Sequence, residues 1–382
     1  MTARPLASLR ERLPDVSGAI GRTWDRLPVW SRWGVYALLA AFAVVVVPMQ
    51  QIGEFMTPAS DWNRVLFHPI GTYILLAIGL NIVVGQAGLL DLGYVAFFAI
   101  GGYTMGVLGA YYGIDFWIIL PAAALITAFS GVILGSPTLR LRGDYLAIVT
   151  LGFGEITRLL FASDWLSPTF GGAQGVTQIA DISIGPWEVR GPESFLYPLL
   201  VLILLAAYVS YALQRSRVGR AWMAMREDES VAEAVGVNIV AAKLSAFIVG
   251  AILAGLGGAL FATQIGSIFP SSFEIEVSIV ILVAVIVGGM ASVPGVMLGA
   301  LVLVGLPELL REFEEFRFLL YGALLIFMML RRPEGFIPSR RRAQELHEAD
   351  IAQDAWLRAR AGASADGETE GGAVVVREPT GR

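Results

Sequence analysis

The stretch VSIVILVAVIVGGMASVPGVMLGALVLVGLP, residues 277–307, contains no charged residue and decides how the rest of the chain is threaded. A helix that crosses a bilayer needs about 20 apolar residues, so this stretch is too long for one simple span. Its middle is interrupted by Gly288, Gly289, Pro294 and Gly295. We therefore predict two membrane segments here, separated by a break or a re-entrant turn.

Apolar runs of similar length recur on both sides of this stretch. With 56% hydrophobic and only 15% charged residues, the composition is that of an integral membrane protein. We predict an all-α, polytopic protein with about ten membrane segments, including broken or re-entrant helices. Besides the two segments in 277–307, the predicted spans are 33–49, 66–84, 90–111, 116–135, 145–162, 195–213, 244–265 and 318–330.

Lys and Arg residues test this threading, because they gather in the cytoplasmic loops of membrane proteins. The basic residues of both ends and of the loops fall on one side only if 277–307 crosses twice or re-enters. The prediction is a multi-pass protein with cytoplasmic N- and C-termini. Its predicted parts are a cytoplasmic tail (1–32), a membrane domain (33–338) with a cytoplasmic loop (214–243), and a cytoplasmic C-terminal tail (339–382) whose composition predicts disorder.

The reactive side chains exclude most catalytic chemistry. Cys is absent and His occurs only at His68 and His347, which excludes thiol catalysis, disulfides and most transition-metal sites. The sequence contains no general acid/base pair, no Ser/His/Asp arrangement and no phosphate-binding GxxxxGK[ST] motif. We therefore predict no enzyme, no catalytic residue, no metal, no cofactor and no basic face for nucleic acid.

Glycine clusters inside the apolar runs have two explanations. Small residues let helices pack closely, which accounts for most of the clusters. Two of them, GQAGLLDLG (85–93) and GGMASVPG (288–295), interrupt their segments as transporters interrupt helices beside a central pathway. Glu155 and Arg158 are charges at membrane depth whose spacing lets them pair on a helix. The candidate pathway residues are Gly85, Gly88, Asp91, Gly93, Gly154, Glu155, Gly288, Gly289 and Gly295.

The stretch VGRAWMAMREDESVAEAVGVNIVAAKLSAF, residues 218–247, places many charges between two apolar runs. Its first part, 219–235, is rich in helix formers and ends at Gly236, a residue suited to a left-handed C-cap. Asn238 is placed to cap the next helix. One face of a helix over this part carries Trp222, Met225, Ala232 and Val235. The stretch is either a connector on the membrane surface or a docking element for a partner.

Five runs stand out in order along the chain: GLNIVVGQAGLLDLGYVAFFAIGGY (79–103), LRLRGDYLAIVTLGFGEITRLL (139–160), the stretch 218–247, IVGGMASVPGVMLGA (286–300) and RRPEGFIP (331–338). Together they closely resemble the LivM-type permease family of branched-chain amino acid ABC transporters, and the resemblance spans residues 35–338. Several ordered motifs are far more specific than a single short one.

The resemblance implies a permease subunit of an ABC importer in the bacterial cytoplasmic (inner) membrane, working by alternating access within the lipid bilayer. A second, LivH-like permease subunit would complete the channel, and an extracytoplasmic substrate-binding protein would deliver the substrate. Two ATP-binding subunits would hydrolyse the ATP and dock on the loop 214–243. By resemblance, the ATPase-coupling residues are Gly219, Arg220, Arg226, Glu227, Glu229, Glu233, Ala234 and Gly236.

The substrate stays open at this point. Leucine, isoleucine and valine are the substrates that the resemblance implies, and related permeases carry urea, short amides or other amino acids. The run FGGAQGV (170–176) departs at Phe170, Ala173 and Gln174 from the family's common Thr-Gly-Gly followed by Pro-Asn-Gly. The alternatives of other classes are a stand-alone secondary transporter, for which charges at membrane depth are too few, and a membrane enzyme without a catalytic constellation.

Overall fold

The computed structural model describes residues 66–309, except 139, 140, 142, 180, 181, 185, 186, 190 and 191, together with 319, 322, 323, 326 and 335–337. Within these residues the secondary structure is helical apart from short strands. The elements are η1 Leu66–Gly71, α6 Thr72–Leu80, η2 Asn81–Gln86, α7 Val95–Ala110, α8 Phe116–Thr138, α9 Asp144–Ala162, η3 Asp164–Leu166, α10 Ser167–Phe170, η4 Gly172–Gln174, β1 Val176–Thr177, β2 Ile182–Ile184, β3 Trp187–Val189, α11 Pro192–Arg215, α12 Arg217–Glu227, α13 Glu229–Ala234, α14 Ile239–Ile265, β4 Ser267–Ile268, η5 Pro270–Phe273, α15 Ile275–Gly288 and α16 Val293–Leu309.

Helices that are long and apolar enough to cross a membrane occupy most of the described chain. Six such spans are present there: His68–Gln86, Phe116–Thr138, Asp144–Ala162, Phe195–Arg215, Ile239–Ile265 and Pro270–Gly288. Val95–Ala110 and Val293–Gly305 are shorter apolar helices. The all-α, multi-pass fold is thus confirmed for this part of the chain. The predicted spans 33–49 and 318–330 and both predicted tails fall outside the described residues, apart from four isolated positions in 318–330.

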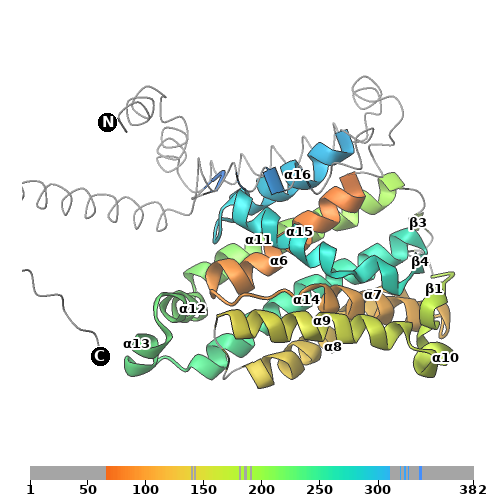
Figure 1. The fold of residues 1–382 in the computed structure, drawn as a ribbon. Coiled ribbons are helices and arrows are strands. Elements are labelled where there is room, and N and C mark those ends of the chain that lie inside the picture. The colour runs from red at the N-terminus through yellow and green to blue at the C-terminus, as the bar shows by residue number, and fades with distance from the viewer. Residues whose placement is uncertain are drawn as a thin grey trace, which may run out of the picture. The chain divides into compact units, whose positions relative to one another are not determined.

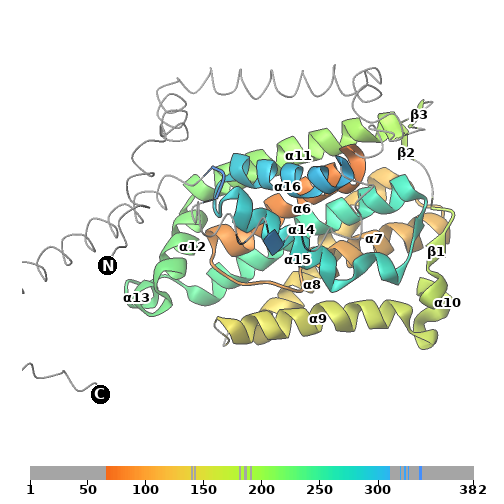
Figure 2. The same cartoon turned by 45° about the horizontal axis from the view of Figure 1, so that its top comes forward.

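Helix α14 packs against α6, α7 and α8, as both views of the ribbon show (Figures 1 and 2). Glycines bring α7 and α14 into backbone contact. A Cβ atom at Gly101 would overlap the backbone of Gly255, and one at Gly258 would overlap the Phe98 carbonyl oxygen. Close helix packing is therefore the physical reason for these glycines.

The helices run between two ends that carry different structures (Figure 1). Helices α12 and α13 lie at one end. At the other end lie α10 and the antiparallel pair β1–β4, in which Val176 faces Ile268. Strands β2 and β3 form a second antiparallel pair, with Ser183 facing Glu188. The segment η1–α6–η2 ends beside α12, whereas α7 contacts β1 and β4, so the chain reverses its direction between η2 and α7.

Candidate functional site

The chain reverses through residues 87–94, which are not helical and are called here the extended segment. Gly88 has a φ of +74°, a left-handed conformation that glycine adopts without strain. Asp91 is fully buried, and its Oδ1 accepts a hydrogen bond of 2.9 Å from the Gly93 amide. An Asp side chain bonded to the backbone two residues on favours a turn over a helix. The predicted interruption at 85–93 is confirmed.

Helix α7 begins at Val95, so the predicted span 90–111 is wrong at its start. Distant helices bind the backbone there. Ser278 Oγ of α15 accepts a hydrogen bond of 3.0 Å from the Val95 amide, and Thr150 Oγ1 of α9 accepts one of 3.0 Å from the Leu92 amide. Inside a membrane no water replaces such partners. The position of the α7 N-terminus therefore depends on α9 and α15.

Helix α9 crosses the extended segment at two glycines. A Cβ atom at Gly93 would overlap the Thr150 carbonyl group, and one at Gly154 would lie 3.2 Å from the Gly93 Cα. Only residues without a side chain allow the two backbones to come this close. Gly93 and Gly154, both predicted as pathway residues, therefore meet in space, and close packing explains why each is a glycine.

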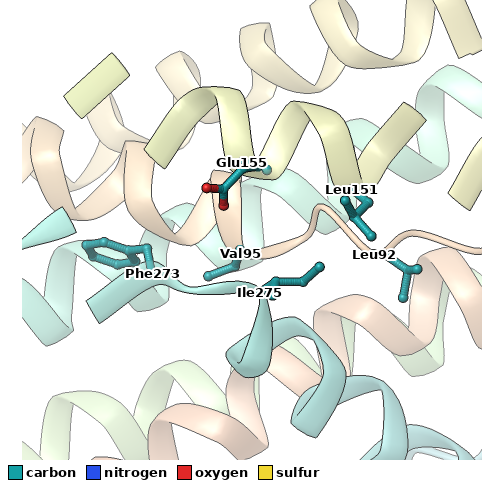
Figure 3. Close-up of a pocket in the computed structure, with 7 residues that line it drawn as sticks. Leu92, Val95, Leu151, Glu155, Phe273 and Ile275 are labelled. Atoms are coloured by element: carbon teal, nitrogen blue, oxygen red, sulfur yellow. The ribbon is translucent and has the colours of Figure 1, made fainter. Parts of the chain in front are cut away.

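A small cavity lies beside this crossing, and Figure 3 shows its lining. Helix α9 contributes Glu155, and the first residues of α7 and α15 contribute Val95 and Ile275. The complete lining is Leu92, Val95, Leu151, Gly154, Glu155, Phe273 and Ile275. The chain after β4 thus returns to the crossing before α15 begins. No signal that we recognised in the sequence predicted this return.

Glu155 and Arg158 form the predicted pair on α9. Arg158 Nε donates a hydrogen bond of 3.0 Å to Glu155 Oε2, and Arg158 Nη2 contacts Glu155 Oε1. The side chains are 25% exposed for Arg158 and 40% exposed for Glu155, although α9 is an apolar span. A charged side chain facing lipid near the bilayer centre costs about 3 kcal/mol on insertion scales. This face of α9 suits an aqueous path or another protein chain rather than lipid tails.

The second predicted interruption, GGMASVPG, is a short turn at 289–292 between α15 and α16. The backbones of Gly288 and Gly295 touch, because a Cβ atom on either would overlap the carbonyl oxygen of the other. Gly289 and Ala291 have φ values of +114° and +64°. This interruption is confirmed, and it takes the form of a turn that joins two helices.

Side chains from two other elements bind the backbone of Ala291 in this turn. Asn81 Oδ1 of η2 accepts a hydrogen bond of 2.8 Å from the Ala291 amide. Gln214 Nε2 of α11 donates one of 2.8 Å to the Ala291 carbonyl oxygen. Gly85 lies beside the Ala291 amide, since a Cβ atom at Gly85 would be 2.6 Å from the Ala291 nitrogen. The turn is therefore held by η2 and α11.

The predicted pathway residues fall into two groups rather than one site. Asp91, Gly93, Gly154 and Glu155 lie at or beside the crossing of α9 with the extended segment. The other group lies where η2, α12 and the 289–292 turn meet, and consists of Gly85, Gly88, Gly288, Gly289 and Gly295. The extended segment joins the two groups.

The charged stretch forms two helices, so the predicted single helix over 219–235 is wrong. Asp228 adopts φ −155° and ψ 115° between α12 and α13. Its Oδ1 accepts hydrogen bonds of 2.8 Å from the Ser230 amide and 2.9 Å from the Val231 amide, as an N-cap does. Asp is a strong N-cap residue, and that signal was present in the sequence. Val235, the C-cap residue of α13, is 73% exposed, whereas its three predicted partners on one face, Trp222, Met225 and Ala232, are buried.

Both predicted caps at the end of this stretch are confirmed. Gly236 has a φ of +89°, and the Val237 amide donates to the Ala232 carbonyl oxygen at 3.0 Å. Asn238 Oδ1 accepts a hydrogen bond of 3.0 Å from the Ala241 amide and caps α14. The region from Val231 to Gly236 is largely exposed, and we call it the tip.

Two buried contacts fasten α12 and α13 to α14. Trp222 is fully buried, and its Nε1 donates to the Ala242 carbonyl oxygen at 2.9 Å and lies 3.0 Å from Ser245 Oγ. Lys243 is 2% exposed, and its Nζ lies 2.7 Å from Glu229 Oε1. Lys243 was not among the predicted site residues. Its signal in the sequence is a single Lys in an apolar helix that follows an acidic stretch.

The predicted ATPase-coupling residues separate into inward and outward sets. Arg226 donates a hydrogen bond to the Gly85 carbonyl oxygen, Glu229 pairs with Lys243, and Gly219 is buried where α11 meets α12. The exposed members are Arg220, Glu227, Glu233, Ala234 and Gly236. Among the described residues no group of three or more His, Cys, Asp and Glu is placed to hold a metal ion.

Comparison with known proteins gives this arrangement its context. The family model described as the branched-chain amino acid transport system permease component matches residues 66–329. The chain belongs to this permease family. The resemblance seen in the sequence is thereby confirmed, and the match contains the extended segment, the cavity, the turn and the charged stretch.

Two kinds of permease are among the relatives of this family member. It is 43% identical over 292 residues to the high-affinity branched-chain amino acid transport permease LivM of Salmonella typhimurium and to that of Escherichia coli K12, covering 70% of this chain and 68% of each relative. It is 27% identical over 289 residues to LivH of Escherichia coli K12, covering 70% of this chain and 91% of that permease. No solved structure matches the chain.

Proposed function

We propose that this ABC importer permease subunit moves branched-chain amino acids, namely leucine, isoleucine and valine, across the bacterial cytoplasmic (inner) membrane. The observation that carries the substrate class is the 43% identity to LivM over 292 residues. This identity is well above the 27% shared with LivH, so the chain corresponds to the LivM type. A LivH-like subunit is then the second permease of the channel.

The substrate path runs along the face of α9 that carries Glu155 and Arg158. The support for this path is the exposure of a charged pair within an apolar span, where lipid contact is costly. The second permease chain closes the path from the other side. The cavity between α9 and the first residues of α7 and α15 is too small to hold an amino acid and is the inner wall of the path.

The tip docks on an ATP-binding subunit at the cytoplasmic side of the membrane, the side on which we also propose both termini. Val231 and Val235 are 60% and 73% exposed beside the exposed Glu233, so the tip presents apolar and acidic contacts to a partner. Exposed apolar side chains next to charges are typical of a helix that enters a groove. Two such subunits hydrolyse ATP for the complex, and the extracytoplasmic substrate-binding protein docks at the α10 end.

Transport needs no bond-making chemistry from this chain. ATP binding and hydrolysis in the partner subunits shift the permease pair between outward-open and inward-open states, because each nucleotide state binds one conformation better. The chain itself needs no cofactor. Its contribution is to expose the path to one side at a time and to transmit the movement of the ATP-binding subunits.

A second substrate class is favoured by the departure at residues 170–176. Phe170 lies 5.9 Å from the Tyr103 ring and 4.9 Å from the Phe161 ring between ring centroids, so it belongs to an aromatic cluster at the α10 end. A family member with a different residue at the position of Phe170 would pack the α10 end differently. Urea, short amides and other amino acids are the solutes to test for this reason.

Uptake by the reconstituted complex tests the proposal directly. Both permeases, the ATP-binding subunits and the binding protein are placed in proteoliposomes with radiolabelled leucine, isoleucine, valine, glutamate or urea. We expect ATP-dependent uptake of the three branched-chain amino acids and none with ADP. Preferred uptake of urea would replace the substrate class, and uptake by this chain without ATP-binding subunits would overturn the ABC importer function.

A further inference from the structure

Arg226 lies at the end of α12 and binds the η2 region, far from it in the sequence. Its guanidinium Nη1 donates a hydrogen bond to the Gly85 carbonyl oxygen. Its Cβ and Cγ atoms lie over Gly88, where an added Cβ atom would come 3.0 Å and 2.6 Å from them. The whole length of the Arg226 side chain is therefore in contact with the chain just before and at the start of the extended segment.

Gly85 and Gly88, which Arg226 contacts, come shortly before residues that line the cavity. Gly88 is part of the extended segment, and Leu92 of the same segment lines the cavity together with Glu155. The backbone in between is not helical, so a displacement at Gly88 is transmitted by a short extended chain. Its far end is fixed by hydrogen bonds to Thr150 and Ser278.

The other end of Arg226 belongs to a firmly held unit. Trp222 binds α14 through its indole nitrogen, and Glu229 pairs with the buried Lys243. Lys243 Nζ also donates to the Leu141 carbonyl oxygen at 3.3 Å, which ties this unit to the connection between α8 and α9. Buried ion pairs and hydrogen bonds of this kind resist separation, because an unpaired buried charge is costly. Helices α12 and α13 therefore move together with the start of α14.

We propose that Arg226 is the residue through which movement of the tip reaches the extended segment and changes the path. This inference rests on the proposed function, in which the tip docks on an ATP-binding subunit. It assigns Arg226 an inward positioning role in place of the ATPase contact that the sequence suggested. The docking contacts are then left to exposed residues such as Glu233.

Thiol labelling in the assembled complex tests this role without relying on uptake alone. The chain has no Cys, so Leu90→Cys places one thiol in the half-buried middle of the extended segment. The rate of N-ethylmaleimide attachment to this chain is measured by mass spectrometry, with no nucleotide and with ATP plus vanadate. The parent for all variants is the complete complex carrying Leu90→Cys.

Arg226→Gln removes the charge and shortens the reach to Gly85, and Arg226→Lys keeps the charge. In the Gln variant we expect normal retention of the ATP-binding subunits and loss of the nucleotide-dependent change in labelling rate. Uptake of the best-transported solute of the panel should fall about tenfold or more, because hydrogen bonds to charged groups have roughly that effect. The Lys variant should keep part of the labelling change. Arg217→Gln, an exposed Arg on the same helix, is the matched control and should behave like the parent.

Each contrary result has a definite meaning. A labelling change of parental size in Arg226→Gln would overturn the inference. Loss of the ATP-binding subunits from this variant would also overturn it, because Arg226 would then be a docking residue. A parent that shows neither nucleotide-dependent labelling nor uptake would overturn the proposed function together with the inference, and this failure is recognised by the presence of an intact Arg226.

Discussion

The extended segment at 87–94 and the turn at 289–292 carry the same sequence signal and form different structures. Each is a glycine-rich interruption of an apolar run. The turn closes in four residues between two helices, and Asn81 and Gln214 bind the backbone N–H and C=O of Ala291. The extended segment instead crosses α9, where its Leu92 amide donates a hydrogen bond to Thr150. The residues that flank it, Gly85 and Val95, are hydrogen-bonded to α12 and α15. Glycine predicts where a membrane helix breaks, and the partners of the freed backbone decide what the break becomes.

The largest effect is expected at the charged pair beside the extended segment. Glu155→Gln or Arg158→Gln alone leaves one unpaired charge on a face that the second permease chain covers in the complex, and burial of an unpaired charge there should lower assembly and stability by about 3 kcal/mol. The double replacement leaves no charge and should be less harmful than either single change. Thermal unfolding of the purified complex and its yield from membranes measure the three variants. Additive losses would show that the two side chains act independently, and would remove the argument for a non-lipid face on α9.

The crossing of the extended segment with α9 should respond to the addition of one methyl group. Gly93→Ala forces the Thr150 backbone away, and an overpacked contact of this kind costs about 2 kcal/mol. Gly152→Ala is the control, because a Cβ atom at Gly152 meets no atom within 4 Å. We expect a lower midpoint of thermal unfolding for the first variant and an unchanged or higher one for the second. Equal midpoints would mean that the backbones are not in contact there.

The turn should depend on the side chain of Asn81. Asn81→Ala leaves the Ala291 amide without its acceptor, and an unsatisfied amide of this kind costs about 1–2 kcal/mol. Gln214→Ala removes the hydrogen bond to the Ala291 carbonyl oxygen and should cost less, because Gln214 is only half-buried and water can replace it. Hydrogen exchange at the Ala291 amide, followed by mass spectrometry, distinguishes the Asn81→Ala variant from the Gln214→Ala variant. Unchanged exchange in Asn81→Ala would contradict this account of the turn.

The smallest effect is expected at the N-terminus of α7. Ser278→Ala removes the acceptor of the Val95 amide and should cost about 1 kcal/mol, as the loss of a helix cap does. Ser271→Ala, at an exposed position nearby in the chain, is the control. The midpoint of thermal unfolding is the measurement. A variant as stable as the control would show that α9 alone positions the start of α7.

Local signals in the sequence predicted much of this fold. The apolar runs between 66 and 307, both interruptions and the caps at Gly236 and Asn238 were predicted, since each depends on neighbouring residues only. The break at Asp228 was missed because good helix formers on both sides hid an N-cap residue. The burial of Lys243 with Glu229 and the inward direction of Arg226 were not predictable, because their partners are set by tertiary packing.

Individual residues of the candidate site were predicted, but their arrangement in space was not. Pairing of Glu155 with Arg158 follows from a spacing of three residues on one helix. The approach of Phe273 and Ile275 to the same helix depends on how the chain returns after β4, and no period or composition signal encodes that return. The roles of these residues in a transport path stay predictions.

The hydrogen bonds of the extended segment also bear on the order of events during synthesis. Residues 87–95 leave the ribosome well before Thr150 and Ser278, the side chains that later bind the backbone amides of Leu92 and Val95. Free backbone amides are not tolerated in a lipid interior. During insertion this part of the chain must therefore be helical or remain within reach of water, and it adopts its final path only after α15 has entered the membrane. The last third of the chain thus acts as the assembly partner of the first.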